Sequence, residues 1–158
     1  MKLKKALCFI LPLFFMACES EHEKFARAER ECSQKTSIDK LELSLYGYSY
    51  EDANSVCIKI QRSGKIIADY MDTIPKKFND PSRLRRDYTI KKNILLTDTL
   101  MVKIADEPAK KLYGFSYAVQ PHFSMMDRDY GCEFSSFVAD GTIVKESTVV
   151  FIKINQNN

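Results

Sequence analysis

The sequence predicts an all-β domain, an antiparallel β-sandwich of immunoglobulin-like or transthyretin-like character, which follows a short helical tether at the N-terminus. Three observations favour this fold. From residue 38 onward, apolar residues recur with a period of two, which is typical of half-buried strands. Turn signals separate these short segments from one another. The connections 71–98 and 119–129 are longer than hairpin turns, as crossovers between two sheets require. A closed barrel that carries a ligand is the alternative fold.

The first 18 residues have the organisation of an export signal. A head with three lysines precedes an apolar run from Ala6 to Phe15. This run is too short to cross a bilayer, which takes ~20 apolar residues, but it has the length of a signal-peptide core. The small residue Ala17 stands directly before Cys18 at the end of the run.

This arrangement resembles the lipobox that ends the signal peptides of bacterial lipoproteins. The resemblance covers only this segment and implies a class of proteins. It implies that residues 1–17 are removed and that Cys18 carries acyl chains such as palmitate, which anchor the protein in a membrane. The expected location is the cell envelope, in the outer membrane facing the periplasm. An ordinary secretory signal, in which Cys18 is not acylated, is the alternative.

Residues 19–36 are expected to form a polar tether between the lipid and the folded body. The segment lacks glycine and proline and is rich in good helix formers. Phe25, Ala28 and Cys32 would fall on one face of a helix and form a thin apolar stripe. We therefore expect a solvated, partly helical spacer over residues 18–36, followed by a β-sandwich domain over residues 37–158.

Seven or eight strands are expected in the body. Leu41, Leu43 and Leu45 alternate with polar residues, so this segment has one apolar face. The clearest hairpin joins 56–60 to 65–70, because Gly64 can supply the positive φ that a tight turn requires. The other segments with strand character are Thr99–Ala105, Lys111–Val119, Tyr130–Ala139, Thr142–Val144 and Thr148–Ile154.

The charge of the mature chain argues against nucleic-acid binding. The whole sequence has a formal charge of +3, but the signal peptide contains three lysines and no acidic residue. Its removal leaves 21 basic and 21 acidic side chains. Because nucleic-acid binding needs a sustained positive field, we expect no nucleic-acid partner.

Three cysteines remain after the signal peptide and the lipidated cysteine are set aside, and an oxidising envelope allows one disulfide among them. Cys57 shares a strand face with Lys59 and should point outward, whereas Cys132 lies in a pattern typical of the core. A bond between Cys32 and Cys57 is therefore the expected pairing. A bond between Cys57 and Cys132, or three reduced thiols, are the alternatives.

The segment from Pro75 to Lys92, here named the basic loop, concentrates positive charge. Seven basic residues and two acidic ones lie between Lys76 and Lys92. Its prolines do not fit the interior of a sheet. Arginines beside aromatic residues suit a carboxylate-rich protein surface, and they would also suit phosphate or anionic lipid. The residues expected to contact a partner are Lys76, Lys77, Phe78, Arg83, Arg85, Arg86 and Tyr88.

A row of tyrosines is the second candidate surface. It is out of phase with the preceding leucines, so either a bulge near Gly47 redirects the chain or one row faces outward. An outward row could form a sticky or sugar-stacking platform. The tyrosines concerned are Tyr46, Tyr48, Tyr50, Tyr113 and Tyr117.

The sequence favours binding over catalysis. His122 is the one histidine of the body, and no serine has the glycine pattern of a nucleophile elbow. His122, Met125 and Met126 offer soft ligands for Cu(I), but their spacing matches no copper motif, so we expect no metal or cofactor.

We therefore interpret the protein as a membrane-anchored periplasmic protein-binding module, for example an inhibitor or an immunity-like protein. The alternative is an accessory structural subunit of a cell-envelope or secretion complex. An enzyme would have to use His122.

Overall fold

The computed structural model describes residues 19–125 and 128–153, without the side chain of Arg83. One α-helix and eleven strands are assigned in this part of the chain. In chain order they are α1 (Glu21–Gln34), β1 (Ser37–Ile38), β2 (Leu41–Tyr46), β3 (Ser55–Arg62), β4 (Lys65–Thr73), the 3₁₀ turn η1 (Pro81–Arg83), β5 (Arg86–Ile90), β6 (Ile94–Leu95), β7 (Thr99–Ile104), β8 (Lys110–Phe123), β9 (Arg128–Ala139), β10 (Thr142–Val144) and β11 (Thr148–Ile152).

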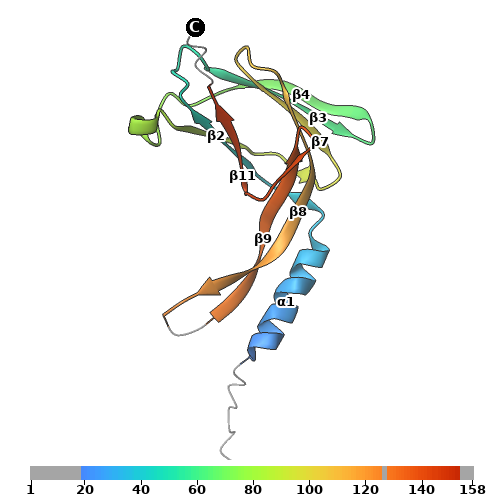
Figure 1. Ribbon diagram of the computed structural model, residues 1–158. Coiled ribbons are helices and arrows are strands. Elements are labelled where there is room, and N and C mark those ends of the chain that lie inside the picture. Colours follow the sequence, from blue (N-terminus) through green and yellow to red (C-terminus); the bar gives the residue numbers. More distant parts are fainter. Residues whose placement is uncertain (1–18, 126–127, 154–158) are drawn as a thin grey trace, which may run out of the picture.

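Two sheets pack face to face in the body (Figure 1). The larger sheet has six antiparallel strands in the order β10-β9-β8-β7-β3-β4. The smaller sheet has the order β11-β2-β5. The predicted all-β sandwich is therefore confirmed. One strand pair departs from the antiparallel prediction, because β11 runs parallel to β2.

The core lies between the two sheets and follows the period-two pattern of the sequence. Leu41, Leu43 and Leu45 of β2 are fully buried, and every second residue of β3 faces them. The hairpin from β3 to β4 is also confirmed. Ser63 and Gly64 both have positive φ, as a type I′ turn requires.

The strands β8 and β9 are longer than the sequence predicts and extend beyond the body as a two-stranded arm (Figure 1). We define the arm as residues 117–123 of β8 and 128–134 of β9. The register of the β8–β9 pair shifts twice between Tyr113 and Tyr117, and Gly114 has a positive φ at this point. Such irregularities bend a strand, so they account for the change of direction where the arm leaves the sandwich.

The helix α1 packs along this arm and is not a free spacer. It begins with a capping box, in which Ser20 and Glu23 satisfy each other's backbone N–H groups. The ring of Phe25 meets the ring of Tyr130 edge-to-face at 5.3 Å, and Ala28 is fully buried. The predicted helix is thus present, and the arm covers its thin apolar stripe in part: Ala28 is buried, whereas Phe25 is 41% exposed. No helix of the described residues is long and apolar enough to cross a membrane.

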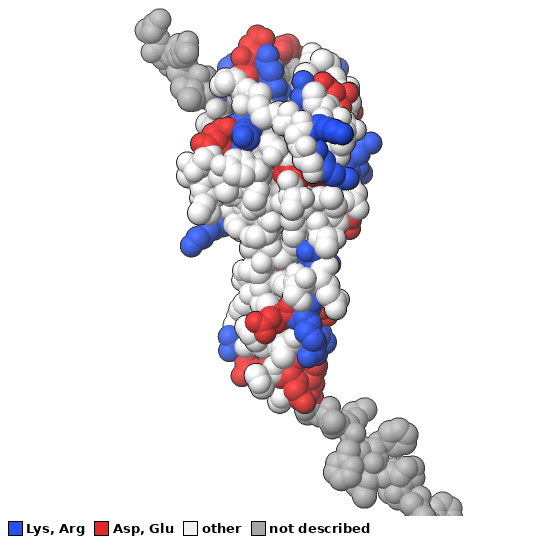
Figure 2. All heavy atoms as spheres, turned by 90° about the vertical axis from the view of Figure 1, so that its right-hand side faces the viewer, with Lys and Arg blue, Asp and Glu red and all other residues white. Residues whose placement is uncertain are grey.

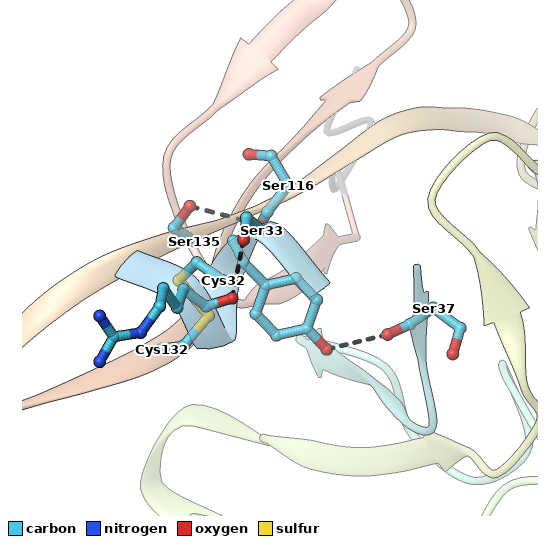
Figure 3. Close-up of a disulfide and its surroundings, with 8 residues drawn as sticks. Cys32, Ser33, Ser37, Ser116, Cys132 and Ser135 are labelled. Atoms are coloured by element: carbon cyan, nitrogen blue, oxygen red, sulfur yellow. Dashed lines mark hydrogen bonds between the residues drawn. A yellow bond between two sulfur atoms is a disulfide. The ribbon is translucent and has the colours of Figure 1, made fainter. Parts of the chain in front are cut away.

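A disulfide between Cys32 and Cys132 joins α1 to the arm (Figure 3). The predicted bond between Cys32 and Cys57 is wrong, because α1 runs beside β9 and not beside β3. Cys57 does face outward on β3, where it is a free thiol opposite Met71 of β4. Cys132 is not a core residue, since the part of β9 that carries it has left the sandwich.

Other contacts fix the junction between the arm and the body. The hydroxyl of Tyr117 donates a hydrogen bond to the carbonyl of Ser37 at 3.2 Å, just after the end of α1 (Figure 3).

In the body, Asp98 is fully buried and accepts two hydrogen bonds of 2.8 Å from the guanidinium of Arg62. This ion pair lowers the pKa of Asp98. It anchors the turn before β7 to the end of β3.

The disulfide should control whether α1 stays on the arm. In a variant with both Cys32→Ser and Cys132→Ser, we expect amides of residues 21–34 to exchange with solvent much faster, whereas those of β3 and β7 stay protected. The physical reason is that an isolated helix of this length is marginal in water. Hydrogen exchange read by mass spectrometry measures the effect.

The matched control is Cys57→Ser, which removes a thiol that forms no disulfide and should leave both regions unchanged. Unchanged exchange of α1 in the double variant would show that its noncovalent contacts with the arm suffice.

Candidate binding surface at the basic loop

The middle of the basic loop is a compact, hydrogen-bonded turn. The carboxylate of Asp80 accepts hydrogen bonds from the backbone N–H and the hydroxyl of Ser82, at 3.1 and 2.6 Å. The backbone N–H groups of Asn79 and Asp80 both donate to the carbonyl of Arg85, and the N–H of Arg85 donates back to the carbonyl of Asp80. These bonds close residues 79–85 on themselves, so the segment is an ordered feature of the surface.

Leu84 lies at the exposed point of this turn. Its backbone is left-handed, with φ 47° and ψ 39°, and the residue is 43% exposed. A left-handed conformation costs a residue with a Cβ about 1–2 kcal/mol. An apolar side chain is therefore held toward solvent by a strained backbone. Sequence reasoning missed Leu84, although an isolated leucine among arginines was a visible signal.

Three of the predicted contact residues carry accessible positive charge in the basic loop. Lys76 and Lys77 are exposed, and the Lys76 Nζ lies 4.4 Å from the centre of the Tyr50 ring. Arg85 is partly exposed and donates from Nε to the Asp87 carboxylate at 2.9 Å. We name Lys76, Lys77, Leu84 and Arg85 the loop surface. Arg83 is part of the same turn, but its side chain lies outside the described part of the chain.

Arg86 does not belong to this surface, so its prediction as a contact residue is wrong. It is the largest fully buried side chain of the described chain. Its Nη2 donates to the carbonyls of Ser49 and Ala53 at 2.7 and 2.6 Å, whereas Nε and Nη1 have no hydrogen-bond partner among the described residues. Burial lowers the pKa of the guanidinium. Arg86 starts strand β5, and the pleat turns its side chain inward with Tyr88 and Ile90.

Tyr88 and Phe78 are also held by the protein itself. Tyr88 is 9% exposed, and its hydroxyl donates to the Asp72 carboxylate at 2.7 Å. Burial raises the pKa of Tyr88, and this hydrogen bond lowers the pKa of Asp72. Phe78 is half-buried, with its ring 5.9 Å from the guanidinium of Arg86. The prediction of Tyr88 as a partner-binding anchor is therefore wrong, and Phe78 is a half-buried ring of the loop.

The segment 49–53 that receives Arg86 is itself tied down. Asp52 accepts a hydrogen bond from the Ser49 N–H and forms an ion pair with Lys153 at 2.7 Å. The bond to Lys153 is the main reason that the pKa of Asp52 falls to about 2. The basic loop thus rests on a segment that is fixed from both sides.

The tyrosines do not form the predicted platform. Gly47 has a positive φ directly after β2, which redirects the chain, and Tyr48 beyond it is buried. Tyr46 and Tyr50 are half-buried beneath cations of the basic loop. Tyr117 lies elsewhere, on the arm, where it contacts Phe134.

His122 lies on the arm, near the end of β8, and not beside the basic loop. Its Nε2 is 2.7 Å from the Glu133 carboxylate on β9, and both side chains are about half exposed. Gly131 packs over the imidazole, where an added Cβ would come within 2.6 Å of the ring. Within the described residues, no group of three histidine, cysteine or acidic side chains is placed to hold a metal ion. Met126, the third member of the soft-metal hypothesis, lies outside them, as does Cys18.

The basic loop lies on the body, away from the start of α1. In Figure 1 the loop, marked by the short green η1 turn, projects from the body, whereas α1 begins at the lower end beside the tip of the arm. Comparison of the chain with protein-family models, curated proteins and solved structures finds no match. The function therefore has to be inferred from the chain's own residues.

Arg86 should stabilise the folded protein much more than an exposed basic residue of the same loop does. Arg86→Ala leaves a cavity and two unpaired carbonyls, so we expect the free energy of unfolding to fall by about 3–5 kcal/mol. Lys77→Ala removes the same charge from an exposed site and should change it by less than ~0.5 kcal/mol. Urea denaturation measures both. Equal stability of the two variants would contradict this structural role of Arg86.

Proposed function

We propose that the chain is a lipid-anchored periplasmic protein that binds a protein partner through the loop surface, in the manner of an inhibitor or an immunity protein. The observation that supports this most directly is the strained, exposed Leu84. Backbone strain tends to gather at functional sites, and an apolar side chain held out at the end of an ordered turn is suited to fill a partner's pocket.

The surroundings of Leu84 indicate the chemistry of the partner. Lys76, Lys77 and Arg85 give the same loop accessible positive charge, which complements an acidic surface with an apolar depression. The hydrogen bonds that close residues 79–85 order the loop before binding, so less conformational entropy is lost in the complex. This arrangement favours recognition of one folded partner.

The proposed lipid anchor would leave the basic loop accessible to a partner. A lipid on Cys18 would stand two residues before Ser20, the residue that caps α1. The basic loop projects from the side of the body, away from the start of α1 (Figure 1). A partner bound to the loop would therefore be kept clear of the membrane.

An accessory subunit of an envelope complex is the second candidate, and the edge of the six-stranded sheet favours it. Strand β4 pairs with β3 on one side and with no described strand on the other. Ile66, Ile67 and Met71 on β4 are exposed. An exposed apolar edge can accept a strand from another protein.

The loop and the edge can be tested against each other. The full-length chain, tagged at the C-terminus, is used to isolate its partner from envelope and secreted fractions, and the partner is then titrated. We expect Leu84→Asp to weaken the purified complex about tenfold or more, because it places a charge where an apolar contact forms. Ile67→Lys on the β4 edge is the matched control.

Loss of binding with Ile67→Lys and not with Leu84→Asp would overturn the loop assignment and favour the accessory subunit. Thermal unfolding of both variants shows whether a loss reflects the fold.

The anchor is tested by metabolic labelling with palmitate. Cys18→Ser should abolish the label and release the protein into the soluble periplasm, because the acyl chains have lost their attachment site. Cys8→Ser, in the signal peptide, should leave the label intact. Continued labelling of the Cys18 variant would contradict the lipobox assignment.

A further inference from the structure

The tip of the arm exposes large apolar side chains. Phe123 at the end of β8 is 74% exposed, and Met125, just beyond it, is 100% exposed. These are the highest values among the large hydrophobic residues of the described chain. Two such side chains near each other in the chain, at the end of a protruding element, are suited to contact with a protein or a membrane.

The start of α1 is fixed beside this tip. The Arg128 guanidinium, 5.2 Å from the Phe123 ring, forms an ion pair with Glu21 in the first turn of α1 at 3.2 Å. The Lys24 ammonium donates to the carbonyl of Arg128, and Arg27 pairs with Asp129 at 3.0 Å. These contacts, with the disulfide behind them, place the N-terminal end of α1 and the arm tip at the same end of the molecule (Figure 1).

We propose that Phe123 and Met125 form a membrane-contact site that enters the interfacial layer of a lipid bilayer. This inference rests on the proposed anchor at Cys18. The chain between Cys18 and the first turn of α1 spans about 10 Å at most when extended, so an acylated Cys18 brings the bilayer to the arm tip. Protein and lipid then meet at two points, and the body is held upright with the basic loop away from the membrane.

The apolar character of the arm tip, and not its charge, favours a lipid bilayer as the binding partner. Acidic and basic side chains alternate at this end of the molecule (Figure 2). Several are paired with one another, as Arg27 is with Glu19 and Asp129. An aromatic ring and a thioether suit the boundary between head groups and acyl chains. Insertion should therefore occur in uncharged lipid and should depend little on salt.

The sequence contains no tryptophan, so one substitution creates a clean reporter. The full-length chain is expressed with Phe123→Trp, isolated with its native modification, and reconstituted in phosphatidylcholine vesicles whose acyl chains carry bromine. We expect a blue-shifted emission and at least twofold quenching. The control is Ile143→Trp, an exposed position on β10 that pairs with Val138, about 30 Å along β9 from Arg128. This control should be neither shifted nor quenched.

A second measurement uses the variant Phe123→Ser/Met125→Ser. If the tip contributes to binding, this variant should leave the vesicles about tenfold faster than the unaltered chain, both at low salt and at high salt. Its thermal unfolding should be unchanged, because both side chains are exposed.

The outcomes separate the tip from the anchor. If the protein carries palmitate and stays on the vesicles but the reporter of the Phe123→Trp variant is not quenched, the anchor stands and the membrane-contact site is overturned. If the protein carries no palmitate, the proposed anchor fails. The tip proposal then holds only if added vesicles still quench the reporter at the tip and not the one on β10, and it is overturned if they quench neither. Quenching of both reporters would also overturn it, because the body would then lie on the membrane.

Discussion

The contact between α1 and the arm is the constraint on which the overall shape depends. A two-stranded ribbon is marginally stable by itself in water, and so is an isolated helix of 14 residues. Each covers the other here, through Ala28, the edge-to-face pair of Phe25 and Tyr130, and the disulfide. The disulfide joins residues 100 positions apart, so in the chain-entropy description it raises the free energy of the unfolded chain by about 4–5 kcal/mol.

This constraint gives the molecule a long axis with two different ends. At one end the first turn of α1 and the tip of the arm lie together, and at the other the body presents the basic loop (Figure 1). Both proposals use this separation. A contact with lipid at one end leaves the loop free to meet a protein at the other, and neither contact requires the sandwich to change its shape.

Local pattern predicted the sandwich but not the arm. Alternation identifies residues that share a face, as in β2 and β3, and the type I′ turn follows from Gly64. It does not say which element covers that face. For this reason Cys132 resembled a core residue, although its part of β9 is covered by α1. The same limit produced the wrong disulfide, because the pairing depends on where α1 lies and not on either strand alone.

Arg86 shows why charge composition overstated the binding site. Arg86, Tyr88 and Ile90 recur with a period of two, which would have indicated one inward face of β5. The predicted contact residues were chosen for the positive charge of the segment, and that choice did not use the period-two pattern. The positive charge of the basic loop is in fact divided between two tasks. Arg86 gives up water to bind two carbonyls of the segment beneath the loop, whereas Lys76, Lys77 and Arg85 remain accessible. A buried ion of this kind contributes little net stability compared with an apolar side chain of the same size. Its effect is to fix one geometry of the segment that carries Ser49 and Ala53. The turn that presents Leu84 is closed separately, by the hydrogen bonds among residues 79–85.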